Sequence, residues 1–187
     1  TTGVSKGAVL LHRNLVANVI QSEAWYQPAL KKVPAGEQIV TICALPLYHI
    51  FGFNSNMMLG MRMGGCNILI PNPRDMPAVL KELTKHKFHS FPAVNTVFNG
   101  LASHPDFNTV NWKSLIISVG GGMAVQSAVA KLWLEKTGCP IVEGYGLSET
   151  SPSVTCNPVD STAYSGNIGM PLPSTDIRLL DDDGVDV

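Results

Sequence analysis

Residues 113–150 read KSLIISVGGGMAVQSAVAKLWLEKTGCPIVEGYGLSET, and their pattern indicates the architecture of the chain. A short β-branched run, Lys113 to Val119, passes through three glycines into a helical pattern, Val125 to Lys136. Gly138 ends that pattern, and a second apolar run, Pro140 to Glu143, follows it. Strand, helix and strand in this order form a βαβ unit, which predicts two parallel strands joined across a helix.

The same alternation of strands and helices continues toward the N-terminus. Apolar residues recur at helical spacing in some segments and form short unbroken runs in others. The predicted helices cover residues 12–25, 53–63, 76–85 and 95–103, and the predicted strands cover residues 38–45, 66–70 and 88–91. The expected fold class is therefore α/β, with a mainly parallel sheet, flanking helices and ligands at the carboxyl ends of the strands.

The first predicted helix carries one apolar stripe. Leu15, Val16, Val19 and Ile20 recur at the spacing of a single helix face, so they are expected to be the residues that this helix buries. A loop containing Pro28 is expected to follow, because proline interrupts the hydrogen-bond pattern of a helix.

The composition changes after Gly146, where serine, threonine, proline, asparagine and glycine become frequent. The run from Ile177 to Leu180 is predicted to be the last strand, with Asp181 to Gly184 as its turn. The sequence therefore predicts two regions: residues 1–150, which are α/β in character, and residues 151–187, which form the truncated start of a β-rich region.

The 187 residues carry a formal net charge of −1, which excludes an electrostatic binder of nucleic acid. Hydrophobic residues make up 45% and charged residues 14%, against about 25% charged in a typical domain, which favours a large core over disorder. The four cysteines include no CxxC pair, so a reducing, cytosolic setting is favoured over a zinc ribbon or a disulfide framework. No apolar run reaches the ~18 residues of a membrane span. The chain opens at Thr1 without methionine or leader and is expected to be part of something longer.

Hydroxyl, glycine and lysine residues open the chain as TTGVSKG, residues 1–7. Glycines let backbone N–H groups approach an anion, hydroxyls add donors, and Lys6 neutralises phosphate charge. The GxxxxGK[ST] spacing of a Walker A loop is absent. The segment therefore predicts either a phosphate-binding loop of another kind or a flexible polar terminus.

Three consecutive glycines, Gly120, Gly121 and Gly122, follow a predicted strand and precede a predicted helix. A ligand can touch bare backbone and a helix N-terminus at such a place. The GxGxxG fingerprint of dinucleotide binding fails, because Val125 stands where the third glycine belongs, although Glu143 lies near the expected acidic position. A nucleotide-binding loop and a tight turn both remain open.

The segment EGYGLSET, residues 143–150, again follows a predicted strand. Two glycines leave the ring face of Tyr145 open, Ser148 offers a hydroxyl, and Glu149 is a carboxylate suited to a hard divalent cation. The hydrolase pattern GxSxG is absent, because Thr150 replaces its last glycine. The alternative to a binding site is a glycine-rich turn with a solvated acid.

His49 follows a predicted strand end among aromatic residues, where a hydrogen-bonded core histidine is the alternative to a catalytic one. His86 and His89 are interpreted as surface residues at a junction between helix and strand. The charged residues around them, Lys81, Glu82 and Lys85, are interpreted as a solvated helix face.

Taken together, these segments resemble the adenylate-forming superfamily and are most similar to its long-chain fatty acyl-CoA synthetases, which are fatty acid–CoA ligases. The resemblance spans essentially the whole chain and implies the central portion of a large N-terminal domain. It also implies a two-step reaction, in which a fatty carboxylate attacks the α-phosphorus of ATP and the thiol of CoA then displaces AMP. The residues that carry it are Thr1 to Gly7, Pro46 to His49, Pro73 to Asp75, Gly120 to Met123, Gly144 to Glu149 and Ile168 to Pro171.

The resemblance implies roles for individual residues. Lys6 is implied to neutralise phosphate charge, and His49 to lie beside the reacting carboxylate. Ser148 is implied to contact the α-phosphate, Glu149 to bind Mg²⁺ and Tyr145 to stack on adenine. Lys6, His49, Ser148 and Glu149 are thus the implied catalytic residues. The implied nucleotide-binding residues are Thr1, Thr2, Gly3, Ser5, Lys6, Gly7, Gly120, Gly121, Gly122, Met123, Gly144, Tyr145, Gly146 and Ser148.

ATP, Mg²⁺ and CoA, the last as co-substrate, are the implied cofactors, and a fatty acid is the implied substrate. Two alternatives stay open: a ligase for an aryl or short-chain acid, and a nucleotide-binding module without turnover. A cytoplasmic enzyme is implied, while a homodimer and peripheral contact with the inner membrane stay open. The family's ribose-binding aspartate, hinge and C-terminal catalytic lysine would lie beyond Val187, so the isolated chain is expected to be inactive.

Overall fold

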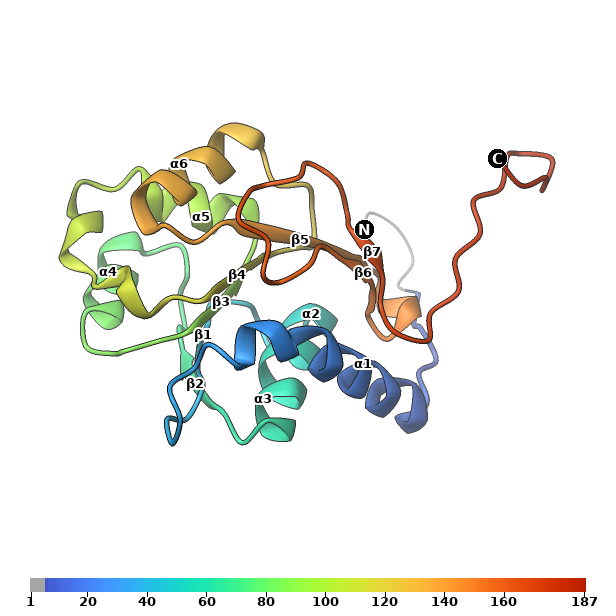
Figure 1. Ribbon diagram of the computed structural model, residues 1–187, viewed down its shortest axis with the longest axis horizontal. Helices are drawn as coiled ribbons and strands as arrows, with labels where there is room; N and C mark the ends of the chain where they lie inside the picture. Colours follow the sequence, from blue (N-terminus) through green and yellow to red (C-terminus); the bar gives the residue numbers. More distant parts are fainter. Residues whose placement is uncertain (1–5) are drawn as a thin grey trace.

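The computed structural model describes residues 6–187 and contains one seven-stranded sheet in that range, in the order β2-β1-β3-β4-β5-β6-β7 (Figure 1). The first five strands in this order are parallel, whereas β6 pairs antiparallel with β5 and β7 antiparallel with β6. The α/β class with a mainly parallel sheet is confirmed. The strands are β1 (Val40–Cys43), β2 (Cys66–Leu69), β3 (Ser90–Ala93), β4 (Ile117–Gly120), β5 (Ile141–Gly146), β6 (Ser153–Cys156) and β7 (Met170–Pro171).

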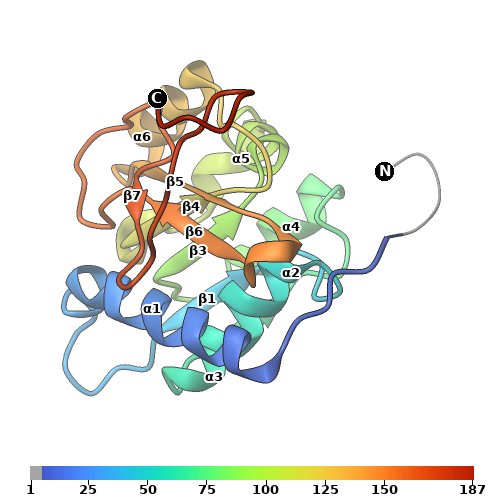
Figure 2. The ribbon, with the colours of Figure 1, turned by 90° about the vertical axis from the view of Figure 1, so that its right-hand side faces the viewer.

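Helices cover both faces of the sheet. One face carries α4 (Met76–Leu83), α5 (Asn95–Ala102) and α6 (Ser127–Thr137), and the other carries α1 (His12–Leu30), α2 (Ile50–Gly52) and α3 (Leu59–Arg62) (Figures 1 and 2). A π-helix, Phe53–Met58, joins α2 to α3. Short 3₁₀ turns complete the chain at Pro105–Thr109, Trp112–Ser114 and Ser148–Thr150.

Each layer of helices has its own core, because successive residues of a strand point to opposite faces of the sheet. On β5, Ile141 packs among α4, α5 and α6, whereas its neighbour Val142 packs toward α1. The first core centres on Trp133, whose ring is fully buried. Its indole N–H donates to the hydroxyl of Ser118 on β4 at 3.0 Å, so the only polar atom of this side chain is satisfied.

The first helix differs from its prediction in length and in orientation. It continues through Pro28 to Leu30, because a proline this close to the C-terminal end disturbs only the final turn. Val16 and Ile20 are each 49% exposed. The buried residues are instead Asn18, Val19, Ser22, Tyr26 and Ala29.

The polar Asn18 is buried because it joins three segments. Its side-chain oxygen accepts from the Asn54 amide at 2.9 Å and from the Ser153 backbone N–H at 3.1 Å, and its amide donates to the Ser153 carbonyl at 2.7 Å. Because these bonds satisfy its polar atoms, Asn18 can lie on the buried side of α1. The spacing of apolar residues does not predict this orientation.

One predicted strand is absent. Ile177 to Leu180 forms no strand, only an isolated bridge between Leu180 and Asp186, because Leu179 and Leu180 are exposed and no neighbouring strand pairs with them. Strands β6 and β7 form the antiparallel edge instead. The stop of α6 at Gly138 is confirmed, since this glycine adopts a left-handed conformation, with φ of 72°.

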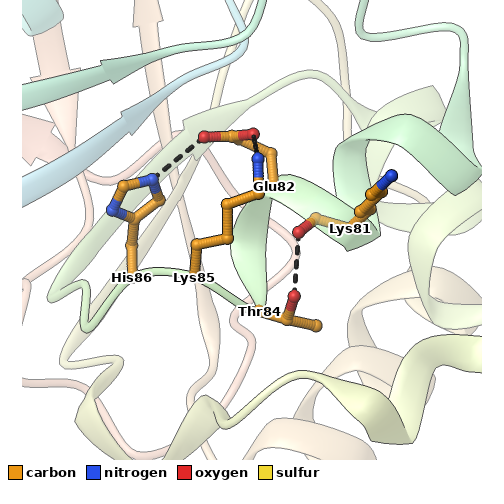
Figure 3. Close-up of polar contacts among 5 residues, drawn as sticks. All are labelled: Lys81, Glu82, Thr84, Lys85 and His86. Atoms are coloured by element: carbon orange, nitrogen blue, oxygen red, sulfur yellow. Dashed lines mark hydrogen bonds and ion pairs between the residues drawn. The ribbon is translucent and has the colours of Figure 1, made fainter.

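His89 is buried rather than on the surface, with 2% of its area exposed. Its Nδ1 accepts from the Val40 backbone N–H at 3.1 Å, which ties β3 to β1. The solvated helix face nearby is confirmed: Glu82 binds Lys85 at 2.5 Å and His86 at 3.0 Å, and Lys81 points outward (Figure 3). No helix within residues 6–187 combines the length and apolar character needed to cross a bilayer.

Candidate active site

A cavity of about 710 Å³ opens at the carboxyl ends of β4 and β5, as expected for an α/β sheet. Most sequence-predicted site residues in the described range meet there, whereas Gly7 and Met123 do not line it. Thr1, Thr2, Gly3 and Ser5 lie outside the described residues. The predicted residues that line the cavity are Lys6, His49, Gly120, Gly121, Gly122, Gly144, Tyr145, Gly146, Ser148 and Glu149.

The loop after β4 needs glycine for steric reasons. A Cβ on Gly120 would lie 2.4 Å from Cγ2 of Val125, and one on Gly121 would lie 3.0 Å from the ring of Phe51. Gly122 has φ of 77°, a conformation that other residues rarely adopt. The loop therefore presents bare backbone to the cavity beside the aromatic ring of Phe51.

Glu143 holds this loop against β5. Its buried carboxylate accepts from the Val125 backbone N–H at 2.7 Å, and the Tyr164 hydroxyl donates to the Val125 carbonyl at 2.6 Å. Burial and the nearby Glu143 carboxylate raise the pKa of Tyr164. Glu143, which stands near the acidic position of the dinucleotide-binding fingerprint, thus has a structural role, because its carboxylate binds the Val125 backbone N–H.

The end of β5 approaches β6 so closely that side chains are excluded. A Cβ on Gly146 would lie 2.2 Å from the carbonyl oxygen of Pro152, and one on Gly144 would lie 3.0 Å from that of Thr155. Between these glycines Tyr145 is 42% exposed, with its ring at the cavity. An exposed ring between two bare backbone positions is suited to stacking against a flat aromatic ligand.

A short 3₁₀ turn carries Ser148 and Glu149 past the end of β5. The Thr150 hydroxyl fixes this turn, because it accepts from the Leu147 N–H at 2.9 Å and donates to the Pro152 carbonyl. Ser148 and Glu149 are exposed and line the cavity. A hydroxyl and a carboxylate therefore face the same space as the glycine loop.

His49 caps the start of α2 instead of lying in the core. Its Nδ1 accepts from the Phe51 backbone N–H at 3.2 Å, so the neutral ring carries its proton on Nε2. Lys6 is exposed and also lines the cavity. The site thus combines one ammonium, one imidazole, one carboxylate and bare backbone N–H groups, a set suited to binding a polyanion.

Sequence reasoning missed the apolar part of the cavity wall, called its apolar end below, as distinct from the polar end with its glycines and charged groups. Burial raises the pKa of the Cys156 thiol to about 12 and also raises that of Tyr26, so both groups are neutral at physiological pH. No motif marks the residues of this wall, because they come from separate elements. The one feature that could have indicated some of them is the helical spacing of Ser22, Trp25 and Tyr26 on α1. The residues of this wall are Ser22, Trp25, Tyr26, Leu59, Val119, Cys156 and Leu172.

Comparison with known proteins adds a family to this geometry. The profile of the AMP-binding enzymes matches residues 1–187. The whole chain is 51% identical to a long-chain-fatty-acid–CoA ligase of Yersinia pestis and 49% identical to one of Salmonella typhimurium, and it covers 33% of each. It also superposes on the crystal structure of ATP-bound MatB from Rhodopseudomonas palustris, with a TM-score of 0.84, 27% identity and coverage of 100% of this chain and 35% of MatB. The chain thus spans about a third of the length of the curated relatives it matches.

Proposed function

The chain belongs to the family of AMP-binding enzymes, and from that premise we propose that it is part of a long-chain fatty acid–CoA ligase. In the first step a fatty carboxylate oxygen attacks the α-phosphorus of ATP, which forms the acyl-adenylate and releases pyrophosphate. In the second step the CoA thiol loses its proton, its sulfur attacks the acyl carbonyl carbon, and AMP leaves. The observation that carries this proposal is one cavity whose lining combines phosphate-binding chemistry with an apolar wall.

The polar end supports binding of a nucleotide. Adenylyl transfer requires positioning and charge neutralisation more than covalent help from the protein. Lys6 and the N–H groups of the glycine loop would neutralise and orient the phosphates, and Tyr145 would stack on the adenine. Ser148 would donate to the α-phosphate, and the Nε2 proton of His49 would lie toward the carboxylate. The fatty carboxylate and the phosphate, both anions, could then approach each other without full repulsion.

Glu149 fits the requirements of a Mg²⁺ site. Within residues 6–187, no three His, Cys, Asp or Glu side chains gather into a dedicated metal cluster. Mg²⁺ in phosphate-transfer sites is held by one or two carboxylates together with substrate phosphates and water, so a single exposed carboxylate that lines the same cavity as Lys6 is sufficient. When bound, the cation would add positive charge where negative charge develops on the phosphates.

The apolar end supports a fatty acid as the acid substrate. Its walls include the side chains of Trp25, Leu59 and Leu172, and the neutral Cys156 thiol adds no charge. Burying the methylene groups of an alkyl chain there removes apolar surface from water, at about 0.8 kcal/mol for each methylene. A short or aryl acid would leave much of this space unused.

The remaining features of the full-length protein are also proposals. Residues 1–150 would form the nucleotide- and acyl-binding region and residues 151–187 the start of a β-rich one, and the change from parallel to antiparallel pairing between β5 and β6 supports a division near residue 150. CoA would enter as co-substrate. On the strength of the family resemblance we propose a cytoplasmic location, peripheral contact of the full-length protein with the inner membrane, and a homodimer.

The test is ATP–pyrophosphate exchange by the full-length protein that contains this chain, with acids from acetate to oleate and with benzoate. Exchange is expected to be highest with long-chain acids. Glu149→Ala should abolish it, whereas Glu135→Ala, which removes an exposed carboxylate on α6 outside the cavity, should leave it intact. Exchange that peaks with acetate or benzoate would identify a short-acid or aryl ligase, and no exchange with any acid would leave only a nucleotide-binding module.

A further inference from the structure

Two hydroxyl groups at the apolar end of the cavity have no role in the proposed reaction. Ser22 and Tyr26 stand one helical turn apart on α1, so their side chains lie on the same face, and both line the cavity. Ser22 is 6% exposed and Tyr26 is 9% exposed. Neither hydroxyl has a hydrogen-bond partner among residues 6–187. Neither oxygen is one of the fully buried side-chain atoms that lack a partner. Both oxygens therefore keep some accessible surface, on residues that line the cavity.

Two other polar groups around the same cavity are already satisfied by the protein. The Thr155 hydroxyl donates to the Ile168 carbonyl at 2.6 Å, and the Trp25 indole N–H donates to the Asn157 carbonyl at 3.1 Å. Burial raises the pKa of Tyr26, which keeps its hydroxyl protonated as a donor. Ser22 and Tyr26 are thus two neutral groups, each able to donate and to accept, beside apolar side chains that line the same cavity.

The occupant of the cavity determines what these hydroxyls bind. Water can solvate them while the cavity is open. An unsubstituted alkyl chain would displace that water and leave both hydroxyls unpaired, which is unfavourable in an apolar environment. A chain that carries an oxygen at the same depth would replace the lost hydrogen bonds. Sites with such groups discriminate strongly against analogues that lack the matching oxygen.

We propose that this end of the cavity selects fatty acids whose chain bears a hydroxyl or keto oxygen, with Ser22 and Tyr26 as the specificity-determining residues. The inference rests on the proposed function, because it requires an acyl chain in the apolar end. It goes beyond that function, because it adds a second functional group to the substrate, located on the alkyl chain at a distance from the carboxylate.

The test measures kcat/KM of the full-length protein for stearic acid and for hydroxystearic acids with the hydroxyl on the third, tenth, twelfth or eighteenth carbon. At least one hydroxystearic acid is expected to exceed stearic acid by about threefold or more, the value of one or two neutral hydrogen bonds. Tyr26→Phe and Ser22→Ala should each reduce that preference by about threefold to tenfold. Tyr48→Phe is the matched control, since Tyr48 is 94% exposed and does not line the cavity.

The outcomes separate this inference from the proposed function. Stearic acid turned over as well as or better than every hydroxystearic acid would overturn the inference and leave fatty acid activation intact. A preference that survives both substitutions would also overturn it. Thermal melting checks that each variant is folded, and Ser22→Ala carries the test if Tyr26→Phe does not fold. If none of the acids leads to release of AMP, the proposed function is overturned, and the inference is overturned with it.

Discussion

The carboxylate of Glu143 on β5 accepts a hydrogen bond from the backbone N–H of Val125, 18 positions earlier in the chain, at 2.7 Å. This contact joins the two loops that form the polar end of the cavity, because Val125 follows Gly120 to Gly122 and Glu143 precedes Gly144 to Gly146. This buried acceptor therefore adds to the pairing of β4 with β5, in which Gly120 lies opposite Glu143, in holding one loop relative to the other.

Removing that acceptor should loosen the cavity. Glu143→Ala leaves the Val125 N–H buried and unpaired, at a cost of about 1–3 kcal/mol. We expect a lower urea midpoint and a raised KM for ATP in pyrophosphate exchange by the full-length protein. Glu143→Gln keeps an oxygen acceptor of the same shape and should recover most of both losses. Equal defects in the two variants would show that the negative charge matters rather than the hydrogen bond.

The close approach of β5 to β6 predicts a sharp effect of one methyl group. In Gly146→Ala the new Cβ would lie 2.2 Å from the Pro152 carbonyl oxygen, a backbone atom that cannot move aside without shifting a strand. We expect a loss of stability and of nucleotide binding. In the matched variant Gly100→Ala the new Cβ meets the end of the flexible Met76 side chain at 2.8 Å, so stability should change little. Thermal melting and ATP binding of both variants check the contrast, and similar behaviour of the two would contradict it.

Ser118 is expected to contribute to stability, because its hydroxyl accepts a hydrogen bond from the buried indole of Trp133. Both residues are fully buried, and the indole N–H donates to the Ser118 hydroxyl at 3.0 Å. Ser118→Ala should therefore destabilise the protein by about 1–3 kcal/mol, since the N–H loses its partner. Ser127→Ala, on the exposed start of α6, should change stability by less than about 0.5 kcal/mol. The free energy of urea unfolding of both variants provides the measurement.

Stability should depend on pH through His89. Burial lowers the pKa of His89 below its ordinary value of 6.5, and the nearby Lys87 lowers it further, although Glu37 opposes the shift. The unfolded chain thus binds a proton at a higher pH than the folded one does. The stabilisation is fully present above about pH 6.5 and is lost as the pH falls from there toward the lowered pKa. His89→Gln should flatten this part of the profile of urea midpoint against pH, and an unchanged slope would assign it to other groups.

Much of the architecture could be predicted because it depends on local patterns. The helix from Ser127 to Thr137, its stop at Gly138 and the strands on either side follow from apolar spacing and one glycine conformation. The orientation of α1 could not be predicted, because Asn18 is buried by hydrogen bonds to Asn54 and Ser153, which lie far away in the chain. His89 became a buried residue for a similar reason, through its contact with Val40.

The candidate site divides in the same way. Local sequence predicted site roles for the glycine loop, Tyr145, Ser148 and Glu149, since each stands in a short motif whose chemistry depends on adjacent residues, and all of them line the cavity. Ser22, Tyr26, Cys156 and the Glu143–Val125 contact appear only once the chain is folded, because each pairs or aligns residues from separate elements. Motifs are contiguous in sequence, whereas burial and cavity walls are made by packing between separate segments. For that reason the polar end of the cavity could be predicted from the amino-acid sequence, and the apolar end could not.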